Sequence, residues 1–179
     1  IDPGAGTAPI SIALNAVREI TDTGKVDATA TWTEWLGPRL AKGEFHNSGF
    51  VVEKDGITTD LGMKGTNITA NDTMDGAIKL TYLLRDSKGV QITVRSRGIG
   101  DTRELYVVED SGSGIYIGRI LGNKTTMLVS EKYPATISRT GERTLEFRAE
   151  GASLVATVNG TFTVSAHDTT LTKGPSSFV

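Results

Sequence analysis

The sequence predicts an all-β protein built as an antiparallel sandwich of two sheets. Apolar and polar residues alternate strictly along most of the segment between Thr144 and Ala166. Gly151 and the pair Asn159-Gly160 interrupt this alternation. Alternation with a period of two, broken by turn residues, is typical of antiparallel strands that each cover a core with one face. The rest of the chain shows neither a helical period nor an internal repeat, which supports the same fold class.

The Asn159-Gly160 turn allows two loop lengths that place Phe162 on opposite faces of its strand. A two-residue loop pairs Val158 with Thr161 and turns Phe162 away from the face that carries Val158. A three-residue loop with Gly160 in the left-handed conformation pairs Val158 with Phe162 and keeps the apolar side chains together. We expect the three-residue loop, because strand register follows the buried face.

The other strands are predicted from apolar runs about 8–12 residues apart, with Gly and Asp between them. The segment Ile10–Ile20 also alternates, inside an amino-terminal region that is rich in Gly, Ala, Thr and Asp. We therefore divide the chain into an amino-terminal arm or edge strand, residues 1–30, and a sandwich, residues 31–179. The further predicted strands are Phe50–Glu53, Ile57–Leu61, Gly62–Ile68, Ala77–Leu84, Val90–Val94, Leu105–Val108, Ile115–Ile120 and Met127–Ser130.

Composition excludes several classes of function. A formal net charge of −2 and a pI near 5.7 give no basic surface for nucleic acid or for an anionic membrane. The chain has no cysteine, so disulfides and thiolate metal sites are excluded, which is compatible with an exported protein. No apolar run approaches the roughly 20 residues that a membrane helix needs. The chain starts at Ile1, so we expect processing or a piece of a longer protein.

Five segments resemble the 3-keto-disaccharide hydrolase-like family, which belongs to the larger group of concanavalin A-like and laminin G-like jelly rolls. They are Asp86–Arg95, Glu104–Asp110, Gly114–Tyr116, Arg143–Arg148 and Val158–Gly160. Two further segments, Trp32–Leu40 and Tyr82–Asp86, look like versions of this domain that occur in bacterial multidomain proteins. The resemblance covers roughly Thr31 to Val179 and implies a jelly-roll sandwich.

Jelly rolls of this group usually end in a further strand that closes the sheet. The chain stops at Ser177-Phe178-Val179. We therefore expect the closing strand either to be cut off or to be supplied by Ile10–Ile20.

If the apolar members of each strand face the core, one sheet displays a polar and aromatic outer face. This assumption points Ile92, Leu105, Val107 and Ile115 inward. The residues that it turns outward are the predicted ligand-binding residues Thr93, Arg95, Arg97, Glu104, Tyr106 and Tyr116. Thr81 is expected on the same face. Such a face suits sugars, since their C–H faces stack on aromatic rings and their hydroxyls bond to Arg and Glu. The alternative is a solvated face with Arg–Glu cross-strand pairs.

Catalysis has little support in the sequence, and we predict no catalytic residue. Glycoside hydrolysis needs two carboxylates about 5–9.5 Å apart on either side of the scissile bond. On a regular strand Glu104 and Glu109 lie on opposite faces and cannot cooperate. If the chain is an enzyme, a glycoside-directed hydrolase or lyase, Glu104 is the candidate.

No cofactor is predicted, and the metal candidates are few. His46 and His167 are both expected in loops, far apart in the sequence, which is not a zinc pattern. Asp72 and Asp75 with loop carbonyls form a candidate calcium site, which the laminin G-like resemblance also implies.

The sequence therefore predicts a non-catalytic carbohydrate- or ligand-binding module of a bacterial, exported protein, with a saccharide or glycan as its partner. One alternative is a hydrolase or lyase of the resembling family. The other is a structural or adhesive subunit that forms homo-oligomers, because its amino-terminal arm adds a strand to the open sheet edge of a neighbouring copy.

Overall fold

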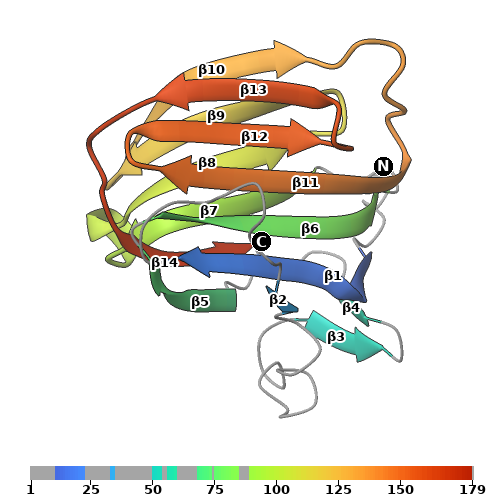
Figure 1. Ribbon diagram of the computed structural model, residues 1–179, viewed down its shortest axis with the longest axis horizontal. Helices are drawn as coiled ribbons and strands as arrows, with labels where there is room; N and C mark the ends of the chain where they lie inside the picture. The colour runs from blue at the N-terminus through green and yellow to red at the C-terminus, as the bar shows by residue number, and fades with distance from the viewer. Residues whose placement is uncertain are drawn as a thin grey trace, which may run out of the picture.

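The structure is a computed structural model that describes residues 11–22, 33–34, 50–53, 56–59, 68–73, 75–84 and 89–178, with side chains for 75–84 and 89–175. Its strands form two antiparallel sheets that pack face to face (Figure 1). The one helical element within these ranges is the short 3-10 turn Gly100–Thr102. The predicted all-β sandwich of two antiparallel sheets is confirmed.

One sheet has eight strands in the order β13-β12-β11-β6-β1-β4-β3, with β2 paired to β1. Its strands are β1 (Ser11–Asp22), β2 (Thr33–Glu34), β3 (Phe50–Glu53), β4 (Gly56–Thr59), β6 (Asp75–Leu84), β11 (Gly141–Glu150), β12 (Ser153–Val158) and β13 (Phe162–His167). We call it the eight-stranded sheet.

The other sheet has six strands in the order β10-β9-β8-β7-β14-β5. Its strands are β5 (Ile68–Thr73), β7 (Val90–Arg97), β8 (Glu104–Asp110), β9 (Gly114–Leu121), β10 (Lys124–Lys132) and β14 (Gly174–Phe178). We call it the six-stranded sheet.

Both ends of the chain contribute strands that differ from the sequence-based expectation. Strand β1 pairs with β6 on one side and with β4 and β2 on the other, so Ser11–Asp22 is an interior strand rather than an edge strand. Gly174–Phe178 pairs with β7 and β5, so the last described residues form a strand of the six-stranded sheet that was not predicted from the sequence. Of the predicted strand Gly62–Ile68, residues 62–67 lie outside the described residues, and Ile68 begins β5.

The core lies between the sheets and follows the alternation of the sequence. Leu145, Phe147 and Ala149 of β11 are buried, and so are Leu154, Ala156 and Val158 of β12. They pack against side chains of the six-stranded sheet, namely Val90, Ile92, Val94, Tyr106, Val108, Ile115 and Ile117. Removing these apolar surfaces from water is the main favourable contribution to folding.

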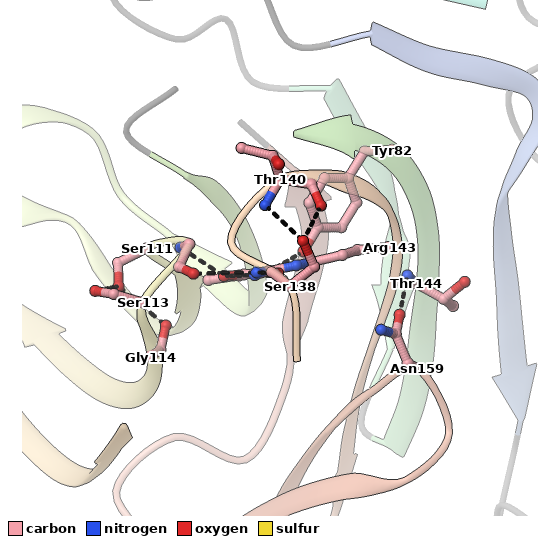
Figure 2. Close-up of polar contacts among 11 residues, drawn as sticks. Tyr82, Ser111, Ser113, Gly114, Ser138, Thr140, Arg143, Thr144 and Asn159 are labelled. Atoms are coloured by element: carbon pink, nitrogen blue, oxygen red, sulfur yellow. Dashed lines mark hydrogen bonds and ion pairs between the residues drawn. The ribbon is translucent and has the colours of Figure 1, made fainter. Parts of the chain in front are cut away.

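The hairpin from β12 to β13 has the three-residue loop predicted from its register. Val158 pairs with Phe162, and Gly160 is left-handed with a φ of 67°. Asn159 is also left-handed, with a φ of 52°. Its backbone N–H donates to the Thr144 carbonyl at 2.8 Å, and its Oδ1 accepts from the Thr144 N–H at 3.0 Å (Figure 2). The loop is therefore tied to β11.

A buried ion pair crosses between the sheets. Nη1 of Arg143, on β11, donates to both carboxylate oxygens of Asp110, on β8, at 2.7 Å each. The Asp110 carboxylate also accepts from the Tyr82 hydroxyl and from the Gly112 N–H. Both charged side chains have relative exposures of 1% or less, and two buried charges are expected to pair with each other in this way.

The same arginine also fastens two connections. Its Nη2 donates to the carbonyls of Gly112, in the turn from β8 to β9, and of Ser138, in the segment that leads into β11. Figure 2 shows the Arg143 side chain extending toward the turn that holds Ser111 and Ser113. Its guanidinium carbon lies 4.9 Å from the centroid of the Tyr133 ring. One residue thus links both sheets and two loops.

Substitution of Asn159 tests the hairpin. We expect Asn159→Ala to lower the free energy of unfolding by about 2 kcal/mol, since alanine loses the bond to Thr144 and is disfavoured in the left-handed conformation. Asn159→Gly loses only the bond and is expected to cost about 1 kcal/mol. Urea unfolding of both variants measures the difference, and equal losses would contradict the left-handed geometry.

Removal of the buried arginine tests the ion pair. Arg143→Met leaves the Asp110 carboxylate buried without its cation, so we expect a loss of about 3–5 kcal/mol in the free energy of unfolding. Arg97→Met is the matched control, because Arg97 pairs with Glu104 at 2.6 Å on the surface, where such a pair contributes about 0–1 kcal/mol. Similar losses in the two variants would refute a structural role for the buried pair.

Candidate ligand-binding face

The six-stranded sheet has one face that points away from the core, which we call the outer face. Ile92, Tyr106, Val108, Ile115 and Ile117 belong to the core, so the residues between them point outward. Strand register aligns these outward residues in rows across the strands. One row contains Gln91, Glu109, Tyr116 and Ser130, and the next contains Thr93, Val107, Gly118 and Met127.

Glu109 lies at the centre of a hydrogen-bond network in the first row. The Gln91 amide Nε2 donates to Glu109 Oε2 at 2.5 Å, and the Tyr116 hydroxyl donates to the same oxygen at 3.0 Å. All three side chains are partly buried. No described residue donates to Glu109 Oε1, so this oxygen is available to accept a hydrogen bond from a ligand.

The Tyr116 ring lies against the sheet. A Cβ built on Gly118 would come 3.3 Å from Tyr116 Cε2 and 3.5 Å from Val107 Cγ1, so the ring leans over the backbone of Gly118. The bond to Glu109 holds its other end. Burial, followed by the Glu109 charge and hydrogen bond, raises the pKa of Tyr116 to about 12. Gly118 and Glu109 therefore fix a neutral aromatic ring across two strands.

The predicted orientation of β8 is wrong. Tyr106 and Val108 point into the core, and Leu105 and Val107 lie on the outer face, where they too are buried. Four consecutive apolar residues carry no period-two signal, so alternation alone cannot assign their face. The Tyr106 hydroxyl decides it, because it donates to Asp168 Oδ1 at 2.6 Å and accepts from the Leu171 N–H at 3.0 Å.

Arg95 was predicted to be exposed, but only 2% of its surface is accessible. A register shift between Val94 and Arg97 forms a β-bulge, and Arg95 takes a left-handed φ of 52°. Its guanidinium donates to Asp75 Oδ1 at 3.0 Å and to the carbonyls of Gly151 and Leu171 at 2.7 and 2.8 Å. It therefore joins the two sheets rather than facing a ligand.

Of the other predicted ligand residues, Thr93 and Tyr116 lie on the outer face, whereas Arg97 and Glu104 lie at the strand ends. Thr93 points outward as predicted but is 5% exposed, and Tyr116 lies outward and partly exposed. Arg97 and Glu104 pair with each other where β7 and β8 are joined by the 3-10 turn, away from the row of Tyr116. Of the predicted residues, only Tyr116 lies in the network around Glu109.

Gln91 and Glu109 are the residues that prediction from sequence did not assign to the site. Their signal is the register, since Gln91, Glu109 and Tyr116 are directly paired on three neighbouring strands. That signal becomes readable only when β8 is placed with Tyr106 inward. Glu109 then shares the outward face of Tyr116 and Gln91.

A second polar cluster lies near the carboxyl end of β13. Arg119 Nη1 contacts Asp168 Oδ2 and Thr170 Oγ1 at 2.5 Å each. Burial on its own would raise the pKa of Asp168, but the hydrogen bonds from Tyr106 and Thr170 and the charge of Arg119 outweigh it and lower the pKa. This cluster holds the segment after β13 against the six-stranded sheet.

The candidate metal ligands are already engaged or lie outside the described residues. Asp75 Oδ1 accepts from Arg95 and from the Gly151 N–H, and the side chain of Asp72 is not described. His46 lies outside the described residues, and His167 is exposed at the end of β13. Among the described side chains, no group of three or more His, Asp or Glu residues is arranged to hold a metal ion.

Comparison with known proteins supports the fold. No protein-family model matches the chain, and no curated protein sequence matches it. Its structure is similar to that of the carbohydrate-binding module CBM66 from Bacillus subtilis, with a TM-score of 0.57 and 15% sequence identity. The match covers 74% of this chain and 83% of that one. At this identity the likeness shows the fold alone.

Alkaline titration tests the surroundings of the tyrosines. The chain has four tyrosines. Burial is the largest cause that raises the pKa of each of them, and a nearby Asp or Glu carboxylate raises it further; they are Tyr82, Tyr106, Tyr116 and Tyr133. We therefore expect less phenolate absorbance from the native protein at pH 10 than from the unfolded chain, whose tyrosines are about half ionised there.

The sign of the accompanying stability change follows from the same shift. Because each folded pKa lies above the unfolded value, the neutral phenols favour the folded state fully below pH 10. This contribution is lost as the pH rises from 10 toward 12, and urea midpoints should fall over that range. Equal phenolate absorbance of the native and the unfolded protein at pH 10 would contradict the burial of these tyrosines.

Proposed function

We propose that the chain is a non-catalytic carbohydrate-binding module whose ligand lies on the outer face of the six-stranded sheet, over Tyr116 and Glu109. The observation that carries the proposal is the Tyr116 ring, held across Gly118 beside a carboxylate oxygen that no described residue occupies. A flat ring offers a surface for the C–H face of a sugar. Glu109 Oε1 offers an acceptor for a sugar hydroxyl.

Preorganisation supports the same proposal. The Tyr116 ring and the Glu109 carboxylate are already held by each other and by Gln91, so a ligand would not have to order them. Val107, beside them on the outer face, is apolar but 1% exposed, so the Tyr116 ring supplies the apolar surface that a ligand would contact. An apolar surface with a few placed polar groups is the usual composition of a small-molecule site.

The fold likeness agrees with this proposal at a coarser level. The similar solved structure is a carbohydrate-binding module, and the two chains share a sandwich architecture. Fold does not determine function, so the argument rests on Tyr116 and Glu109. We further propose that the module belongs to an exported bacterial protein related to the 3-keto-disaccharide hydrolase-like family. No helix within the described ranges could span a membrane.

The two alternatives have less support. Glu104 forms an ion pair with Arg97 at the end of its strand, and Glu109 lies on the opposite face of β8, so the two carboxylates do not flank a common site. Strand addition through the amino-terminal segment would need an unpaired strand, but β1 is paired on both sides within its own sheet.

Binding measurements test the proposed site. We expect the protein to bind a neutral saccharide from a glycan array, and Tyr116→Ala or Glu109→Gln to weaken that binding about tenfold or more. Gly118→Ala should also weaken it, since the new Cβ meets Tyr116 Cε2 at 3.3 Å and displaces the ring. Calorimetric titration gives the affinities.

The matched control is Thr163→Ala. Thr163 is exposed on β13 of the other sheet and bonds to Thr157, far from the proposed ligand. Its affinity should equal that of the wild type. Unchanged affinity in Tyr116→Ala and Glu109→Gln, with folding intact, would remove this face as the site.

A further inference from the structure

Met127 is an exposed apolar side chain beside the proposed site. It pairs directly with Gly118 across β9 and β10 and is 61% exposed. Among the described side chains, Met127 and Ile99 are the large apolar residues with high exposure. A single exposed apolar residue is ordinary on a protein surface, so its position must carry the argument.

A β-bulge turns Met127 toward the outer face. The register of β10 shifts between Met127 and Val129, where Val129 pairs with the core residue Ile117. In a regular strand Met127 and Val129 would share one face. The extra residue lets Leu128 and Val129 pack against the core while Met127 stays outside. Bulges commonly redirect side chains next to functional sites.

The redirected side chain extends the surface formed by the tyrosine. The Tyr116 ring, which lies over Gly118, and Met127 form an apolar surface across β9 and β10, whereas Val107 on β8 is covered. One strand spacing of about 4.7–4.9 Å separates β9 from β10, so Met127 extends the surface beyond the strand that carries Tyr116. Gly118 has no side chain, so nothing of its own rises between the ring and Met127.

We propose that Met127 forms a second subsite and that the ligand is therefore an oligosaccharide of at least two units. One unit packs on Tyr116 and bonds to Glu109, and the next unit packs its C–H face on Met127. This inference rests on the proposed function. The flexible thioether side chain can adapt to an irregular sugar surface, which suits a contact that is apolar and weakly directional.

Affinity as a function of ligand length tests the proposal. Neutral gluco-, galacto-, manno- and fructo-oligosaccharides of one to five units are titrated into the wild type, Met127→Ser, Met127→Leu and Tyr116→Ala. In the series that binds, we expect the wild type to bind the disaccharide about tenfold more tightly than the monosaccharide. Met127→Ser should abolish this gain without changing monosaccharide affinity, and Met127→Leu should keep most of it.

The outcomes separate the subsite from the site itself. Equal affinity for one and two units in the wild type, or a gain that survives in Met127→Ser, overturns the second subsite while Tyr116→Ala still weakens binding. If Tyr116→Ala binds every length as the wild type does, the proposed site fails and the subsite fails with it. The same holds if no saccharide of the panel binds.

Discussion

The ion pair between Arg143 and Asp110 is the constraint on which the sandwich depends. It joins β11 of one sheet to β8 of the other, in a place where both charges are removed from water. A buried pair gives little net stability compared with apolar packing, but an arrangement that breaks it leaves a charge unpaired. Arg95 also joins the two sheets, at the other end of β6 and β11, where it bonds to Asp75 and to the Gly151 carbonyl. Two arginines, one from each sheet, therefore restrict how the layers can be placed.

That restriction determines which side chains reach the outer face. Asp110, Val108 and Tyr106 share the inward side of β8, and each has a partner there, which leaves Glu109 and Val107 outside. Val107 is nevertheless buried, so the outer side of β8 is covered at that position, while Glu109 is only partly buried. Glu109, Gln91 and Tyr116 then fall in one row because the three strands are in register. The candidate site is thus a consequence of the core, although none of its polar residues belongs to the core.

On the proposed ligand face, apolar contacts and hydrogen bonds would contribute differently to recognition. The Tyr116 ring and Met127 can offer only surface, whereas Glu109 offers direction through an unoccupied oxygen. A glycine between them makes the surface continuous, and a bulge sets its far end. Sugars combine apolar faces with hydroxyl edges, so such a surface matches their chemistry better than that of a nucleic acid or an acidic peptide. The net charge of −2 agrees with the proposed saccharide ligand.

The sequence by itself determined the fold class and much of the core. Alternation from Leu145 to Val164 located three strands and the three-residue loop at Gly160, because burial of one face dictates register. Only the tertiary structure decided the face of β8, because Leu105, Tyr106, Val107 and Val108 carry no alternation and the partners of Tyr106 are 62 and 65 residues away. It alone decided that Arg95 is buried, since a bulge changes the count of residues along β7. The interior position of β1 was likewise decided by pairings with distant strands, which local patterns do not contain.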